Sequence, residues 1–245
     1  NLVRKWYDPN YRFENLSYND KEAIALINSG DNNGIFQIEG TGITQMMQDL
    51  DIGGFETPRF EDRDESKLST IERIRGMEIQ DFMWISAGIA LYRPGPLDAV
   101  IEGKTMVQHL IDRKAGREPV TYLFPEEKMY LEETYGILVY QEQVMSRVRQ
   151  MTGCSYGRAD ILRKAMGKKD PVLMKEQMDW FKENAMKHVF SEDPRYEDVE
   201  YKTKIVERAA DEIDKFARYG FNKAHTVEYG HIAYENAYYK AHYPD

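Results

Sequence analysis

The stretch "GRADILRKAMGKK" (157–169) decides how the rest of this chain is interpreted. At 3.6 residues per turn it forms a helix with an apolar side and a cationic side, the first carrying Ile161, Leu162 and Met166 and the second Arg163, Lys164 and Lys168. Gly167 is expected to break the helix, with Lys168 and Lys169 at the break. The pattern therefore predicts an amphipathic helix with positive charge gathered at its C-terminal end.

This positive charge contrasts with the net charge of −9 of the 245-residue chain. Residues 140–182 contain nine Lys and Arg and only five acidic residues. A solvated basic face is one interpretation, because exposed charges are common on helices and the helix dipole favours cations at a C-terminus. Polyphosphate binding is the other, because Arg offers a planar fork of donors and Lys a point charge.

A second stretch, "KFARYGFNKAH" (215–225), alternates cations with aromatic residues. Gly220 and Asn222 suit a sharp turn between two helices. Aromatic rings beside cations can stack on bases while the cations contact phosphates. The same rings can instead fill the core of a helical protein.

The pattern of apolar residues, caps and breakers predicts a mainly α fold, a multi-helix domain with a few short β-strands. The expected helices are residues 19–30, 77–92, 106–116, 127–136, 141–152, 156–166, 170–190, 197–218 and 223–241. "GIFQIEG" (34–40) alternates apolar and polar residues and is expected to be extended. The acidic segment 54–73 is typical of an exposed loop or insertion.

Composition restricts the class of protein. A hydrophobic fraction of 42% with 31% charged residues predicts a soluble globular protein. No apolar run is long enough to span a bilayer, so no membrane partner is expected. The single cysteine, Cys154, excludes an intrachain disulfide and fits a reducing cytoplasm. The missing initiator Met is expected of a piece cut from a longer chain.

Six motifs, in their order and spacing along the chain, resemble those of the C-family of bacterial replicative DNA polymerases. This is the family of the DNA polymerase III alpha subunit. The motifs are "GIFQIEG" (34–40), "LYRPGP" (91–96), "TYGILVYQEQVM" (134–145), "ADILRKAMGKK" (159–169), "YGFNKAH" (219–225) and "YYKAHYP" (238–244). Departures such as Lys164 and Ala224, where the family commonly has Arg and Ser, indicate a divergent member and leave bacterial and phage origins open.

The resemblance implies that residues 1–245 are a fingers domain. Its expected portions are an N-terminal part (1–53), the acidic insertion (54–73), a helical middle part (74–136) and a nucleotide- and DNA-contacting helical part (137–245). The family holds its catalytic aspartates in the palm domain, and their motifs are not found here. No catalytic residue and no metal site is therefore expected in this chain, and Mg²⁺ is expected only in the full polymerase, on palm residues.

The resemblance also implies roles for particular residues. Those expected to bind the dNTP triphosphate are Arg163, Lys164, Lys168 and Lys169. Those expected to contact the base, the sugar or the primer–template are Tyr219, Asn222, Lys223, His225 and Arg93. The implied partners are primer–template DNA, dNTP, the palm domain of the parent chain, and the sliding clamp and exonuclease subunits.

The implied function is thus the nucleotide-binding part of a DNA-directed DNA polymerase, a nucleotidyltransferase, which is inactive as a fragment. The alternative is a stand-alone helical module that binds nucleic acid through the same cations without polymerising. Two Asp-x-Asp pairs, Asp49 with Asp51 and Asp62 with Asp64, lack the flanking residues of the palm motif and are interpreted as solvated turns.

Overall fold

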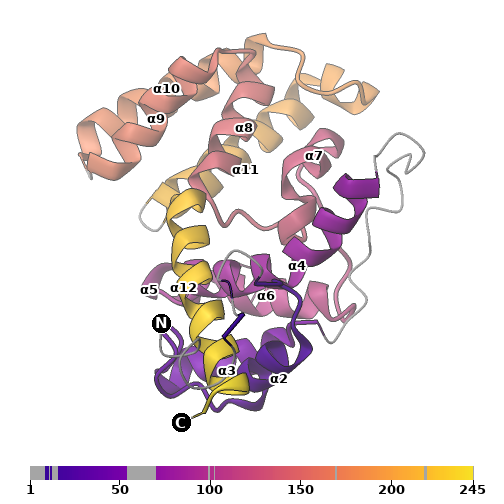
Figure 1. Cartoon of the computed structure of the whole chain (residues 1–245). Coiled ribbons are helices and arrows are strands. Elements are labelled where there is room, and N and C mark those ends of the chain that lie inside the picture. Colours follow the sequence, from indigo (N-terminus) through magenta and orange to yellow (C-terminus); the bar gives the residue numbers. More distant parts are fainter. Residues whose placement is uncertain are drawn as a thin grey trace. The chain divides into compact units, whose positions relative to one another are not determined.

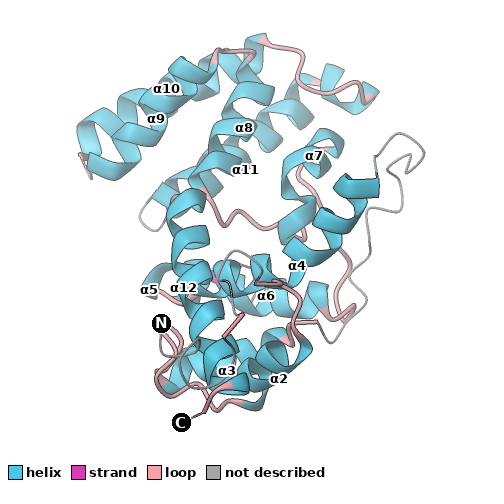
Figure 2. Cartoon of the chain, in the orientation of Figure 1, coloured by secondary structure: helices cyan, strands magenta, loops and turns pink. Residues whose placement is uncertain are grey.

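The computed structural model describes residues 9–10, 12, 16–53, 70–98, 100–101, 103–168, 170–217 and 220–244. Figure 2 shows that these residues are mostly helical, which confirms the predicted mainly α class. The strands β1 (Val100–Ile101) and β2 (Lys104–Thr105) pair antiparallel, with Val100 opposite Thr105. Within the described ranges no helix is both long and apolar enough to cross a membrane.

The chain divides into two compact units. The first comprises residues 1–92 and 224–245, with α2 (Lys21–Ser29), α3 (Thr41–Leu50), α4 (Thr70–Leu91) and nearly all of α12 (Lys223–His242). The second comprises Arg93–Lys223. It contains α5 (Pro94–Asp98), β1, β2, α6 (Met106–Lys114), η3 (Pro125–Glu127), α7 (Lys128–Leu131), η4 (Glu132–Thr134), α8 (Gln141–Thr152), α9 (Tyr156–Lys168), α10 (Pro171–Lys187), η5 (Pro194–Glu197) and α11 (Val199–Ala217). Figure 1 labels most of these helices.

In the first unit, local signals set the helix ends. The Asp20 carboxylate accepts from Ala23 N at the start of α2, and Gly30 ends that helix at a φ of 86°. The predicted apolar helix 77–92 is confirmed as the C-terminal part of α4, where Ile85 is fully buried. The helix begins earlier than expected, at Thr70, so the last four residues of the predicted loop 54–73 are helical, and residues 54–69 lie outside the described part.

The prediction of an extended "GIFQIEG" segment is wrong, because these residues form consecutive turns. Ile35 N donates to Asn32 O (3.0 Å) and Ile38 N donates to Ile35 O (3.2 Å). Both isoleucines are fully buried although they are three residues apart. A strand would put residues three apart on opposite faces, so burial of both favours the turns.

In the second unit, helices α8 to α11 surround one apolar core. Its members come from all four helices and include Val148, Leu162, Phe181 and Ile213. The predicted helices 141–152, 156–166, 170–190 and 197–218 are confirmed within a few residues. Gly167 does not break its helix, since α9 continues to Lys168. Ile161 was expected on the apolar side but is 47% exposed.

The segment before α8 departs most from the prediction. Residues 127–136 were expected to form one helix, but η3, α7 and η4 divide them. The Tyr130 carbonyl, which a continuous α-helix would pair with the amide of residue 134, instead accepts from Gln143 Nε2 (3.2 Å). Tyr135 and Gly136 then take left-handed conformations, with φ of 50° and 79°, and end the helical run.

Candidate functional site

The helix α9 carries the first predicted set of site residues. Its buried side consists of Ala159, Leu162, Ala165 and Met166, which pack into the core of the second unit. This packing fixes the helix and leaves the cations outside: the Arg163 and Lys164 side chains are 30% and 63% exposed. Lys168 is exposed in the last turn, and Lys169 lies outside the described residues.

Asp160 holds two of these cations in place. Arg163 Nε donates to Asp160 Oδ1 (2.6 Å), and Lys164 Nζ lies 2.9 Å from Asp160 Oδ2. These contacts, that of Lys164 first, lower the pKa of the Asp160 carboxyl below its ordinary value. The pairing is on the surface, so the two cations stay accessible to an anion from solvent.

The other cations counted near α9 in the sequence have different roles. Arg147 is fully buried, where Nε donates to Glu127 Oε1 (2.6 Å) and Nη1 donates to Glu212 Oε2 (2.7 Å). Arg158 stacks on the Trp180 ring with its Cζ 3.4 Å from the ring centroid. The basic excess predicted from residues 140–182 is therefore smaller on the surface than in the sequence.

The second predicted stretch forms a turn between α11 and α12, called here the 220–223 turn. It packs on the start of α8: Tyr140 and Phe221 form a parallel β-bridge, Gln141 N donates to Phe221 O (2.9 Å), and Gln141 Nε2 donates to Gly220 O (3.1 Å). These bonds fix its backbone to the "YQE" motif. Gly220 and Asn222 lie in a short non-helical stretch before α12, and residues 218 and 219 of the predicted turn lie outside the described residues.

Lys223 is tied to two glutamates. Its backbone N donates to Glu142 Oε2 (3.0 Å), and its Nζ donates to Glu133 Oε2 (2.6 Å) while lying 5.3 Å from the Tyr140 ring centroid. A carboxylate at the first residue of α12 also complements the positive end of the helix dipole. Asn222 lies within the turn, and Tyr219 lies outside the described residues.

Arg93 of "RPGP" also reaches the 220–223 turn. Its Cζ lies 3.6 Å from the centroid of the Phe221 ring, a cation–π contact. Burial lowers the pKa of Arg93 to about 10, so the side chain remains charged at neutral pH. The structure therefore brings together three predicted residues of the second set, Arg93, Asn222 and Lys223.

His225 lies in the first turn of α12, in the part of that helix that belongs to the first unit. Its ring centroid is 4.2 Å from that of Tyr229, and its Nδ1 is 3.8 Å from Glu228 Oε2. Among the described residues no group of three or more His, Cys, Asp or Glu side chains is placed to hold a metal ion. Asp51 ends α3 at a φ of 46°, and Asp62 and Asp64 lie outside the described residues.

The connection between α8 and α9 relates the two sets of residues. Only residues 153–155 separate these helices, so the chain reverses and they form a helical hairpin with a shared core. Gln141, which holds the 220–223 turn, is the first residue of α8, and Lys168 is the last residue of α9. Two cavities in this unit, of about 690 and 410 Å³, are lined by other residues.

Sequence reasoning underestimated Gln141, Glu142 and Glu133. The first two were recognised as part of a motif, but only the fold shows that they bind the backbone of the 220–223 turn. Glu133 lies 90 residues from Lys223, and nothing in the local pattern pairs them. The signal that could have found Gln141 and Glu142 is the polar "QE" pair directly after an apolar run, at the position of a helix start.

A family model described as the bacterial DNA polymerase III alpha subunit finger domain matches residues 1–57 and 65–189. The chain is 35% identical over 243 residues to DNA polymerase III subunit alpha of Aquifex aeolicus, covering 99% of this chain and 17% of that protein. The corresponding proteins of Campylobacter jejuni and Bacillus subtilis are 37% and 33% identical, with 99% of this chain covered and 17% and 18% of theirs. The chain thus spans less than a fifth of the length of these relatives.

Proposed function

Because the chain belongs to the family of bacterial DNA polymerase III alpha subunit finger domains, we propose that it binds the incoming dNTP and contacts primer–template DNA during template-directed nucleotidyl transfer. The observation that carries the proposal is the set of accessible cations on α9, in a chain whose net charge is −9. The apolar side of α9 packs firmly in the core, so its cations are held on a rigid support.

The triphosphate contacts are assigned to Arg163, Lys164, Lys168 and Lys169. A triphosphate concentrates several negative charges in a small volume, and charge-assisted hydrogen bonds to it are stronger than neutral ones. Asp160 keeps Arg163 and Lys164 in fixed positions before the nucleotide arrives, which reduces the ordering that binding requires. Fixed positive charge near the leaving pyrophosphate also stabilises the charge that develops there.

Contacts to the base, the sugar or the primer–template are assigned to Tyr219, Asn222, Lys223, His225 and Arg93. Arg93, over one face of the Phe221 ring, and Lys223, at the end of the 220–223 turn, supply positive charge beside this aromatic residue. This combination suits stacking on a base with phosphate contact beside it.

The chemical step requires groups that this chain is not expected to contain. Carboxylates of a palm domain would hold Mg²⁺, which activates the primer 3′-oxygen and neutralises the leaving pyrophosphate. The chain alone is therefore expected not to polymerise. Its contribution is to close over a correctly paired nucleotide and so to help select it. The sliding clamp and exonuclease subunits are proposed partners of the full polymerase.

The test uses a polymerase that contains this chain together with its palm domain. Arg163→Ala and Lys168→Ala are each expected to raise the KM for dNTP in single-nucleotide incorporation about tenfold or more, the value of a charge-assisted hydrogen bond. DNA affinity should change much less. Lys204→Ala and Lys187→Ala are matched controls, because each removes an exposed lysine paired with a glutamate four residues before it.

Unchanged incorporation kinetics in both α9 variants would contradict the triphosphate role. If the chain instead bound DNA tightly and with sequence preference at moderate salt, without a palm domain, the stand-alone nucleic-acid-binding module would be the better account.

A further inference from the structure

A groove with an acidic rim lies on the second unit, between α9, α10 and α11. Its volume is about 690 Å³. Methionines 166, 174 and 178 and small residues such as Ala210 line it, so its floor is apolar. Methionine side chains are unbranched and polarisable and adapt to partners of different shape. The groove is large enough to take several side chains of a partner.

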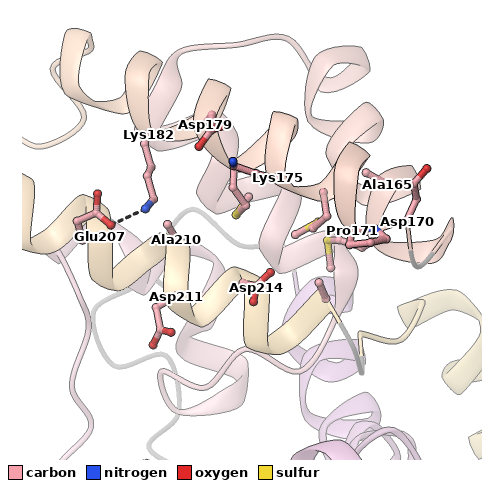
Figure 3. A pocket seen from close by; sticks show the side chains of 14 residues that line it. Ala165, Asp170, Pro171, Lys175, Asp179, Lys182, Glu207, Ala210, Asp211 and Asp214 are labelled. Atoms are coloured by element: carbon pink, nitrogen blue, oxygen red, sulfur yellow. Dashed lines mark hydrogen bonds and ion pairs between the residues drawn. The ribbon is translucent and has the colours of Figure 1, made fainter.

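The rim of the groove is negative. Five carboxylates line the groove, those of Asp170, Asp179, Glu207, Asp211 and Asp214, against the two ammonium groups of Lys175 and Lys182. Two of the carboxylates are already paired: Glu207 Oε2 accepts from Lys182 Nζ (2.5 Å), a contact that Figure 3 shows spanning α10 and α11, and Asp211 Oδ2 lies 2.8 Å from Nζ of Lys215, which is outside the groove. Asp179 of α10 and Asp214 of α11 are also labelled beside the groove in Figure 3.

The negative charge excludes the ligands of the proposed function from this groove. A phosphate group or a DNA backbone would be repelled by the rim, whereas a cation would be attracted. The cations Arg163, Lys164 and Lys168 of α9 do not line the groove, although Ala165 and Met166 of the same helix do. The side of α9 that carries cations and the side that borders the groove therefore suit different partners.

We propose that this groove binds a cationic amphipathic helix of a protein partner, with apolar side chains on the methionine floor and Lys or Arg side chains on the acidic rim. Helix-in-groove recognition places apolar anchors at positions i, i+3, i+4 and i+7 of the bound helix. The carboxylates at 207, 211 and 214 follow a similar spacing along α11 and form a row beside such a helix, whose cations would share the first two with Lys182 and Lys215. The row selects a positively charged partner and fixes the side on which its charges lie.

The test measures binding of a fluorescent designed peptide to the full chain by anisotropy. The probe is a helix of about 18 residues with Leu at the anchor positions and Lys elsewhere, long enough to present anchors over several turns. One control peptide has the same composition in an order that destroys the apolar face, and another has Glu in place of Lys. The amphipathic cationic peptide is expected to bind at least about tenfold more tightly than either control.

Two variants of the chain locate the peptide. Asp179→Lys combined with Asp214→Lys is expected to weaken binding about tenfold or more. Its matched control, Glu183→Lys combined with Glu200→Lys, makes the same change of charge on α10 and α11 at exposed positions outside the groove, and it should retain most of the affinity. Ala217→Trp, which adds an indole beside the groove without a change of charge, should also weaken binding, with folding checked by circular dichroism.

Two results would overturn the proposal: equal binding of the scrambled peptide, or equal losses in the two charge-reversal variants. Equal losses would mean attraction to the net charge of the chain alone. Neither of these results bears on dNTP binding by α9, so the two proposals can fail separately.

Discussion

At the scale of single residues, two side chains of the same type have different roles because one is buried and the other is on the surface. Arg147 and Arg163 are sixteen positions apart and look alike in the sequence, yet Arg147 is 1% exposed and Arg163 is on the surface. The carboxylates decide this difference: Arg147 meets Glu127 and Glu212 inside the unit, and Arg163 meets Asp160 on its own helix. The local pattern predicted the cationic side of α9 but not the buried contacts of Arg147, because the partners of Arg147 come from distant segments.

Replacement of Arg147 by Met is expected to lower the free energy of unfolding by about 3–5 kcal/mol. The change leaves Glu127, which is also 1% exposed, as a buried carboxylate without its guanidinium partner. Urea unfolding followed by circular dichroism measures the loss. Lys204→Ala, which removes an exposed pair with Glu200, should cost no more than about 0.5 kcal/mol. A loss of less than 1 kcal/mol in Arg147→Met would show that the buried pair is not important for stability.

Asp112 is expected to make the stability of the protein depend on acid pH. Its contacts with Lys104, and also with Arg117 and Gln108, lower the pKa of this carboxyl to about 2, below the ordinary value of about 4. A lowered pKa contributes stability above pH about 4, and this contribution disappears as the pH falls towards 2. Asp112→Asn should therefore destabilise the protein at neutral pH and reduce its further loss of stability between pH 4 and 2. Thermal unfolding across this range, with Asp49→Asn as control, measures the effect, and parallel pH profiles of wild type and Asp112→Asn would contradict it.

At the scale of elements, predictions succeeded where the signal was local. Asp20 and Asp170 accept from helix-start amides, and Gly30 and Gly153 end helices, so both ends of α2, the end of α8 and the start of α10 follow from local signals, whereas α10 ends at Lys187 and not at the predicted residue 190. The predictions failed where a contact with a residue distant in the sequence determined the backbone conformation. The run 127–136 is divided by Gln143 of α8, and "GIFQIEG" forms turns because two isoleucines three apart are both buried.

The hairpin of α8 and α9 gives a test at this scale. Gly153 has a φ of 67°, and a Cβ there would lie 2.8 Å from His188 Cε1. Gly153→Ala is therefore expected to lower the melting temperature, with a loss of about 1 kcal/mol or more. Gly157→Ala is the matched control, because Gly157 lies within α9 and its added Cβ would meet only Ser155 Oγ, at 3.9 Å. It should be neutral or stabilising, and equal effects of the two substitutions would contradict the account of the hairpin loop.

At the scale of the whole molecule, the net negative charge contrasts with the local charge around α9. The net charge is −9, while α9 presents accessible cations on one side and borders an acid-rimmed groove on the other. The order of six motifs was sufficient to predict the family. It could not reveal the groove, whose lining comes from three helices and whose negative side chains are ordinary surface residues in the sequence.

The isolated chain is expected to bind DNA weakly and with strong dependence on salt, because few cations contact phosphates and the remaining charge is repulsive. Anisotropy titrations of a labelled primer–template should show little sequence preference and a loss of affinity between about 50 and 200 mM salt. Lys223→Ala, at a residue assigned to the primer–template, should reduce the salt dependence, and Lys204→Ala should leave it unchanged. Affinity that is independent of salt would contradict this prediction.

The central claim is that the cations of α9 meet the triphosphate of the incoming nucleotide. The most direct test is photocrosslinking with a dNTP that carries a photoreactive group on its γ-phosphate. The dNTP is bound to the polymerase that contains this chain, in complex with a primer–template. Mass spectrometry then maps the crosslinked residues. The account predicts crosslinks within residues 160–169 that require the nucleotide complementary to the template. Crosslinks at the groove residues of α10 and α11, or at α9 with every nucleotide alike, would contradict it.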